Sequence, residues 1–277
     1  MRNILNNYRK YRRQRAELPS QQELVPVMTK WFSSELGQTL YAAEKNQLDP
    51  LLARSFGYHI LQISCSAEID LIAESPAGHK LKFAPKYIPG QKQAVALAEA
   101  LPLESDSVDT VVLHHALDFT PDKHRLLREA TRVIIPGGKL LIVGFNPFSL
   151  WGGAKLIRWH RAPPWNARFV PGSRVSDWLE LLEFRVDQIT HGGYLLPLNY
   201  RRLLRYADFL ERTGQRMSNP LGAFYVITAY KERVPITPVV RRWPRLAAPV
   251  LGRPGIEPAG LRHHQVADGK VKGKPVQ

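Results

Sequence analysis

The chain has 277 residues, with 39 lysines and arginines against 24 acidic residues, and a net charge of +15 at pH 7. A chain of this length buries enough surface for one large domain without a disulfide or a metal to support it. Cys65 is the only cysteine, which excludes an intramolecular disulfide and leads us to expect a reducing, cytoplasmic location. Because no apolar run of signal-peptide length and no run of ~20 apolar residues occurs, we expect neither a signal peptide nor a membrane span.

The positive charge is concentrated at the two ends of the chain. Residues 1–15 carry +6 and residues 231–277 carry +7, so residues 16–230 carry only +2. This distribution predicts a near-neutral folded domain over 21–234, a basic leader over 1–20 and a basic Pro- and Arg-rich tail over 235–277. We expect both ends to be mostly disordered, with a basic amphipathic helix as the alternative for the leader. Nucleic-acid binding through these ends is conceivable, but a basic face on the folded domain is not indicated.

Residues 22–56 have the periodicity of helices. Apolar residues from Leu24 to Leu36 recur at steps of three and four, and Gly37 is placed to end a first helix. A second helix is expected from Tyr41 to Phe56, broken near Asp49, which would cap a new helix starting at Pro50.

After residue 56 the pattern changes to short apolar runs that alternate with helical segments. The predicted strands are 59–64, 79–84, 93–97, 109–113, 139–145, 184–190 and 223–231. The predicted helices are 121–134, a helix that starts near Ser173 or Ser176 and runs to Leu182, and a helix around 200–213. Continuous apolar strands that alternate with helices predict a parallel sheet covered on both faces.

Two stretches in the middle of the chain carry a specific motif. Residues 98–117 contain an acidic-Leu-Pro sequence followed by Ser107-Val108-Asp109, which leads into a strand. Residues 126–140 contain Leu127-Arg128-Glu129 on a helix and then Pro136-Gly137-Gly138, a turn in which proline presets one backbone angle and glycine permits positive φ. The order and spacing of these parts resemble the class I S-adenosylmethionine-dependent methyltransferases, in particular the type 11 methyltransferase domain, with Val108 in place of the usual phenylalanine.

Further residues narrow the resemblance to an uncharacterised bacterial subgroup of these proteins. They are Trp31-Phe32, Gly37, Leu61-Gln62 and the segment 144–152. The resemblance implies a three-layer α/β sandwich with a seven-stranded, mostly parallel, Rossmann-like sheet whose last strand is antiparallel. It also implies S-adenosyl-L-methionine as the cofactor, without indicating a methyl acceptor.

Ligands of such sheets bind beyond the carboxyl ends of the strands, where the strand order reverses. The candidate cofactor-binding residues are therefore Ser64, Cys65 and Ser66 after the first strand, Leu97, Ala98 and Glu99 after the third, and His114 at the end of the fourth. We expect these residues to surround a gap wide enough for a nucleoside.

Three features that the resemblance would imply are absent. No glycine occurs over residues 63–67, no acid occurs from Lys80 to Lys86, and Leu97 stands at the usual position of an acid or amide. An acid or amide at these positions would hydrogen-bond the cofactor. Each such hydrogen bond that is lost costs about 1–3 kcal/mol where its partner stays buried.

The sequence assigns no catalytic residue. His114 and His115 are candidates for a general base or for structural histidines. Because adjacent strand residues face opposite ways, we expect at most one of them to line the site. Because His114 and His115 are adjacent on a strand and diverge, and His124 falls on the following helix, we expect no metal site. Asp118 is interpreted as a turn cap rather than a site residue.

Aromatic residues at the end of the fifth strand and after it have two interpretations, either a lid or acceptor pocket at the site or ordinary packing of a long loop. They are Phe145, Phe148, Trp151, Trp159 and Trp165. The function that these patterns favour is an S-adenosylmethionine-dependent methyltransferase acting on an unidentified small-molecule or macromolecular acceptor. The alternatives are a catalytically degenerate protein of the same fold that serves as a binding or regulatory partner, and a nucleic-acid-associated protein that uses its basic ends.

Overall fold

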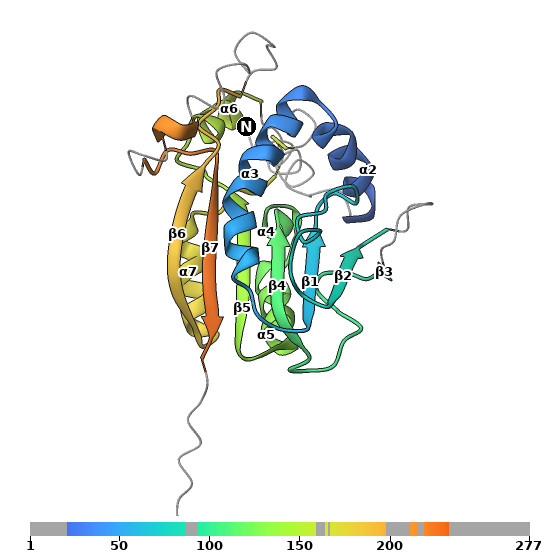
Figure 1. Ribbon diagram of the computed structural model, residues 1–277. Helices are drawn as coiled ribbons and strands as arrows, with labels where there is room; N and C mark the ends of the chain where they lie inside the picture. The colour runs from blue at the N-terminus through green and yellow to red at the C-terminus, as the bar shows by residue number, and fades with distance from the viewer. Residues whose placement is uncertain are drawn as a thin grey trace, which may run out of the picture. The chain divides into compact units, whose positions relative to one another are not determined.

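The computed structural model describes residues 21–86, 94–158, 164–165, 167–197, 211–214 and 219–232 (Figure 1). The predicted leader, the predicted tail and most of the predicted helix over 200–213 lie outside these residues. Among the described residues, no helix is both long and apolar enough to cross a membrane.

Within the described residues, seven strands form one sheet in the order β3-β2-β1-β4-β5-β7-β6. β7 runs antiparallel to both of its neighbours, and the other pairs are parallel. This confirms the predicted seven-stranded, mostly parallel sheet with the last strand antiparallel. The strands are β1 (His59–Ser64), β2 (His79–Ala84), β3 (Ala94–Val95), β4 (Val108–His114), β5 (Ile134–Phe145), β6 (Phe184–Gly192) and β7 (Phe224–Lys231).

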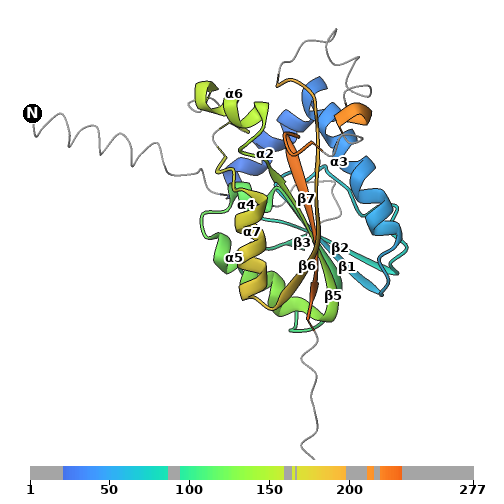
Figure 2. The ribbon, with the colours of Figure 1, turned by 90° about the vertical axis from the view of Figure 1, so that its left-hand side faces the viewer.

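Helices cover both faces of the sheet, as Figure 2 shows with the sheet nearly edge-on. α3 (Glu35–Ala53) lies on one face, while α5 (Lys123–Val133) and α7 (Gly172–Leu181) lie on the other. Other helices among the described residues include α2 (Gln21–Phe32), α4 (Ala116–Phe119) and α6 (Leu150–Arg158). Because β1, β4 and β5 are buried on both sides, their apolar runs contribute to two separate cores.

The helix boundaries near the N-terminus differ from the prediction. Gly37 does not end a helix: it lies in the first turn of α3, where an added Cβ would stand 2.3 Å from the Trp31 carbonyl oxygen of α2. Its role is close helix approach, and Ser34 caps α3 by accepting from the Gly37 N–H. The predicted break at Asp49-Pro50 is also wrong. Asp49 pairs with Lys45, and α3 continues through Pro50 to Ala53, because a proline in the last turn removes only one helical hydrogen bond.

The segment between β1 and β2 contains no helix. Residues 65–78 are described throughout and form turns and bends, with Ile69, Leu71 and Ile72 buried against the core. This face of the sheet is therefore covered by α2, α3 and an irregular segment. No helix N-terminus follows the carboxyl end of β1, a position that suits anion binding.

Candidate functional site

The strand order reverses between β1 and β4, which are parallel neighbours. The last residues of these strands lie opposite each other, with Ser64 paired to His114 in the register. The carboxyl ends of β1 and β4 therefore meet at one edge of the sheet, the position at which open α/β sheets bind ligands.

A cavity of about 30 Å³ lies at this edge. Three of the predicted cofactor-binding residues line it, namely Ser64, Cys65 and Ala98. Leu24 and Val25 of α2 form part of its wall, and both are buried. The expected gap for a nucleoside is thus nearly filled, because α2 packs its apolar face against the end of β1.

The other predicted positions do not line this cavity. Ser66 contacts Thr29 of α2, with 3.2 Å between the two hydroxyl oxygens. Leu97 is exposed and Glu99 is partly exposed. His114 faces a different set of polar groups.

Those polar groups form a buried cluster around Glu44, a residue of α3. The His114 Nε2 atom lies 2.9 Å from Glu44 Oε2, and the His115 Nε2 atom lies 2.8 Å from Glu44 Oε1. The outer nitrogen of each ring has a second partner: His114 Nδ1 lies 2.8 Å from Ser64 Oγ, and His115 Nδ1 lies 2.9 Å from Asp118 Oδ2. The side chains of Glu44, His114, His115 and Asp118 are fully buried.

The expectation that His114 and His115 point in opposite directions is wrong. β4 ends at His114, and His115 adopts the left-handed conformation with φ of +50° as it enters α4. This backbone geometry is uncommon outside glycine and turns the His115 ring to the same side as His114. The backbone is held there by a hydrogen bond from the His115 N–H to the Val143 oxygen.

The cluster has a definite charge pattern. Burial acts to raise the pKa of Glu44, but the charges and hydrogen bonds of His115 and His114 outweigh burial and bring it to about 2. Burial acts to lower the pKa of His115, but Glu44 and Asp118 outweigh it and raise it to about 9. Burial lowers the pKa of His114 below its ordinary value. Near neutral pH, ionised Glu44 therefore joins a protonated His115 to a neutral His114.

Asp118 is part of this cluster, so its interpretation as a turn cap is wrong. Its Oδ2 atom accepts from the Phe145 N–H at 3.0 Å in addition to facing His115. Its Oδ1 atom is buried and has no hydrogen-bond partner among the described residues. His124 lies away from the cluster and contacts Trp178.

The aromatic residues after β5 support the packing interpretation. Trp151 is buried, lies near Phe145 and Trp165, and donates its indole N–H to the Leu195 oxygen at 3.0 Å. Phe148 is exposed, and Trp159 lies outside the described residues.

Sequence analysis missed Glu44. A usable signal was present, because Glu44 is the middle one of five positions spaced four residues apart. The other four are leucines: Leu36, Leu40, Leu48 and Leu52. A carboxylate on the apolar face of a helix requires a buried partner.

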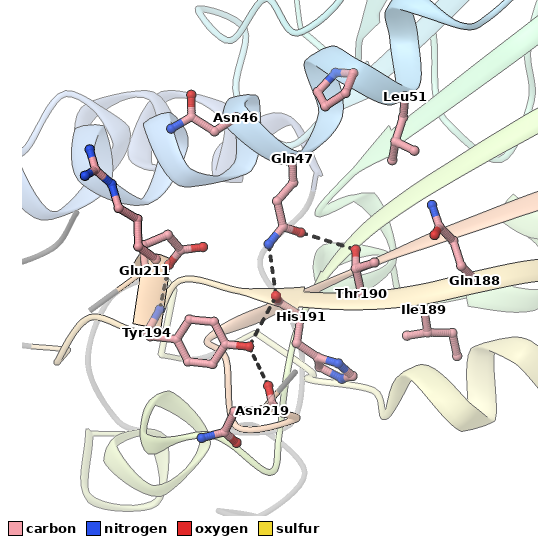
Figure 3. Close-up of a pocket in the computed structure, with 12 residues that line it drawn as sticks. Asn46, Gln47, Leu51, Gln188, Ile189, Thr190, His191, Tyr194, Glu211 and Asn219 are labelled. Atoms are coloured by element: carbon pink, nitrogen blue, oxygen red, sulfur yellow. Dashed lines mark hydrogen bonds between the residues drawn. The ribbon is translucent and has the colours of Figure 1, made fainter. Parts of the chain in front are cut away.

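A larger pocket of about 670 Å³ lies between α3 and β6 (Figure 3). The Gln47 side chain of α3 lines this pocket and reaches β6. Its amide donates to the His191 oxygen at 2.9 Å, and its oxygen accepts from the Thr190 hydroxyl. The Tyr194 hydroxyl donates to the Asn219 oxygen. Because β6 is parallel to β5, the His191 end of this pocket lies at the same edge of the sheet as His114.

The comparisons with known proteins agree with the fold. Residues 48–142 match the model of the family described as "Methyltransferase domain". A crystal structure from Thermotoga maritima, described as an S-adenosylmethionine-dependent methyltransferase and possible histamine N-methyltransferase, superposes with a TM-score of 0.56. The two chains are 20% identical, and the superposition covers 73% of this chain and 93% of the Thermotoga maritima chain. A ubiquinone/menaquinone biosynthesis C-methyltransferase of Acidiphilium cryptum is 34% identical over 98 residues, 35% of this chain and 37% of that protein.

Strand order, strand direction and the matched domain together define a class I S-adenosylmethionine methyltransferase domain. Within this class, the chain belongs to the same protein family as the uncharacterized protein YafS of Escherichia coli. The two are 35% identical over 213 residues, which span 75% of this chain and 82% of that protein.

S-adenosylmethionine is the cofactor that this class implies, and the described conformation does not fit it. Small-molecule pockets have volumes of ~300–1,000 Å³. The cavity at the β1 and β4 ends has a volume of about 30 Å³, close to the volume that one water molecule occupies in the liquid. The described residues of β2 and its end, His79 to Lys86, include no acid, and no helix follows β1.

Proposed function

We propose that this chain is an S-adenosylmethionine-dependent methyltransferase with an unidentified acceptor, and that the cofactor enters only when α2 leaves the sheet edge. The observation that carries the proposal is the class I sheet with its reversal of strand order between β1 and β4. This reversal is the ligand position of such sheets. When bound, the cofactor would supply an electrophilic methyl group on its sulfonium.

Apolar and polar contacts both hold α2 at this edge. The buried side chains Leu24 and Val25 supply apolar contacts. The Thr29–Ser66 contact is polar, and just after α2 a long contact of 3.5 Å joins the Ser33 hydroxyl to Glu68. On displacement of α2, the residues exposed at the edge would be Ser64, Cys65 and Ala98, which we propose contact the cofactor.

The α3–β6 pocket is the proposed position of the acceptor. Its volume of about 670 Å³ lies within the range of small-molecule sites, and its His191 end shares the sheet edge with β1 and β4. Its lining is mixed, with amide and hydroxyl groups from Gln47, Thr190 and Tyr194 beside Leu51 and Ile189. We further propose a bacterial, cytoplasmic protein, in keeping with its single cysteine.

Binding of S-adenosylhomocysteine to the full chain tests the proposal. The double variant Leu24→Ala/Val25→Ala removes the side chains that fill the edge, and each buried truncation weakens α2 packing by roughly 2–5 kcal/mol. We expect weak binding by the unmodified chain and at least about tenfold tighter binding by the variant, since one factor of ten corresponds to only ~1.4 kcal/mol. Ligand at ~100 times its Kd should raise apparent stability by ~2.7 kcal/mol.

Met28→Ala is the matched control, because Met28 is buried on the same helix but does not line the cavity. Equal binding gains in the control and the double variant would mean that general loosening of α2, not the opened cavity, is responsible. No calorimetric heat and no melting shift in any of the three proteins would overturn the proposal. That result would favour the degenerate binding protein instead.

A further inference from the structure

We propose that Glu44, His114 and His115 bind a divalent transition-metal ion, such as Zn²⁺, through one carboxylate and two Nε2 atoms. The ligand atoms of these three residues all lie within 4.8 Å of one another. Sequence analysis expected no metal because adjacent strand residues diverge, and the left-handed backbone of His115 removes that reason.

The separations suit an ion at the centre of the cluster. Each Nε2 atom lies 2.8–2.9 Å from a different oxygen of Glu44. Ligand atoms this close to one another can share an ion at the usual bond lengths of ~2.0–2.2 Å for imidazole nitrogen and carboxylate oxygen. Two imidazoles with one carboxylate form a ligand set typical of zinc and of non-haem iron.

The outer hydrogen bonds strengthen the inference. Metal-binding histidines almost always donate their second ring N–H to a carboxylate, a carbonyl or a water. Here His115 Nδ1 faces the Asp118 carboxylate and His114 Nδ1 faces the Ser64 hydroxyl, so both second nitrogens are already satisfied. With protons on both Nδ1 atoms, both Nε2 lone pairs point at Glu44, where the ion would lie.

Binding of the ion requires both histidines to be uncharged ligands and the Glu44 carboxylate to be ionised. Binding then displaces the proton that His115 Nε2 shares with Glu44, and this proton goes to solvent. At His114 the proton moves from Nε2 to Nδ1, and the Ser64 hydroxyl changes from donor to acceptor, which a hydroxyl can do in place.

The positions of the ligands are fixed by rigid elements. His114 lies at the end of a central strand, and the His115 ring stacks on Phe145 with 3.9 Å between centroids. Glu44 lies on α3 between the buried Leu40 and Leu48. Because the cluster is fully buried, we expect the ion to be taken up during folding and to exchange slowly.

Metal content of the tag-free full chain tests the proposal. The protein is unfolded in denaturant with EDTA, refolded with or without Zn²⁺, freed of loose metal and measured by elemental analysis. We expect about one zinc per chain, as in a single mononuclear site. Refolding with Co²⁺ should produce visible d–d absorption bands of a nitrogen-ligated ion.

Variants then locate the ion. His114→Gln and His115→Gln should each lower the zinc content at least about tenfold, and Asp118→Asn should weaken zinc affinity 10–100-fold, as losses of outer partners do. His124→Gln, on α5 beside Trp178, should retain full zinc content.

Refolded unmodified protein that holds no zinc and gives no Co²⁺ spectrum would overturn the proposal, and this result does not depend on any variant folding. Zinc that is retained equally by His114→Gln and His115→Gln would also overturn it, because the ion would then lie elsewhere.

Discussion

Glu44→Gln isolates the charge of the buried cluster. The change keeps the size of the side chain, and the amide can accept from His115 and donate to His114, so both hydrogen bonds survive. What is lost is the negative charge between two rings that are fully buried. We expect the metal-free protein, kept in EDTA, to lose stability mainly by this electrostatic route.

The magnitude follows from the pKa of Glu44, which falls from 4.5 to about 2 in the folded protein. At 1.36 kcal/mol for each pKa unit this corresponds to about 3 kcal/mol. Loss of one partner from a buried ion pair costs a similar 3–5 kcal/mol. For a domain of this size the melting temperature should fall by roughly 6–12 °C.

The pH dependence distinguishes charge from packing. The contribution of Glu44 is present above its ordinary pKa and is lost as the pH falls from about 4.5 through about 2. The contribution of protonated His115 is complete below its ordinary pKa of 6.5 and is lost as the pH rises through about 9. The full difference between the unmodified chain and Glu44→Gln should therefore appear near pH 6. Near pH 9.5 it should shrink below about 1 kcal/mol or change sign, because an ionised Glu44 without its partner then bears only the cost of burial.

Urea unfolding followed by tryptophan fluorescence and circular dichroism measures the difference at both pH values. Asp49→Asn on the same helix is the control: its pair with Lys45 is partly exposed and should contribute at most about 1 kcal/mol. A Glu44→Gln cost that is equally large at pH 6 and pH 9.5 would refute the electrostatic reasoning. A cost at pH 6 no larger than that of the control would refute it as well.

Two further substitutions test how the start of β1 is held. Asp109→Ala should cost about 1–3 kcal/mol in urea unfolding, because the Asp109 carboxylate accepts from the Tyr58 and His59 N–H groups at 2.9 and 2.8 Å; an unchanged free energy of unfolding would contradict this. Gly57→Ala should cost more than about 2 kcal/mol, since Gly57 has φ of +131° and an added Cβ would lie 2.3 Å from the Asp109 Cβ. Gly153→Ala, whose added Cβ meets no atom within 4 Å, should be neutral or stabilising, and equal costs for the two glycines would contradict the steric account.

The fold was predictable because its signals are local and repeated. Runs such as 111–113 are apolar on both faces, and the motif from Ser107 to Gly138 indicates the order of strand, helix and strand, so the sheet follows from chain-order rules. The predicted roles of single residues were wrong where a residue makes its main contact with a segment distant from its own turn. Gly37 admits the α2 backbone instead of ending a helix, and the Asp109 carboxylate accepts from N–H groups at the start of β1, about 50 residues earlier in the chain.

The site was less predictable because it depends on two long-range placements. Period-two alternation separates His114 from His115, and only a left-handed residue at the strand end brings them together. The expected nucleoside gap required knowledge of where the apolar face of α2 packs. An amphipathic helix shows which face it buries but not which edge of a sheet receives that face.

The cofactor proposal requires α2 to leave the sheet edge, whereas the metal proposal requires α3, which carries Glu44, to stay in place. Glu44 joins α3 to β4 through charged hydrogen bonds to His114 and His115, so moving α3 would expose a buried ion pair. α2 is attached at the same sheet edge by the apolar side chains of Leu24 and Val25 and by the Thr29–Ser66 contact, and the turn at Ser33–Ser34 divides it from α3. Phe32, the last residue of α2, lies beside both histidines, with ring centroids 5.4 Å from His114 and 6.3 Å from His115. Displacing the Leu24 and Val25 end of α2 therefore leaves the ligands of the proposed metal in place as long as Phe32 keeps its position. If this reasoning holds, Leu24→Ala/Val25→Ala changes S-adenosylhomocysteine binding without changing zinc content, and His115→Gln lowers zinc content while α2 still closes the edge. A double variant that loses its zinc would show that α2 and the cluster form one cooperative unit, and the two sites would then have to be explained together.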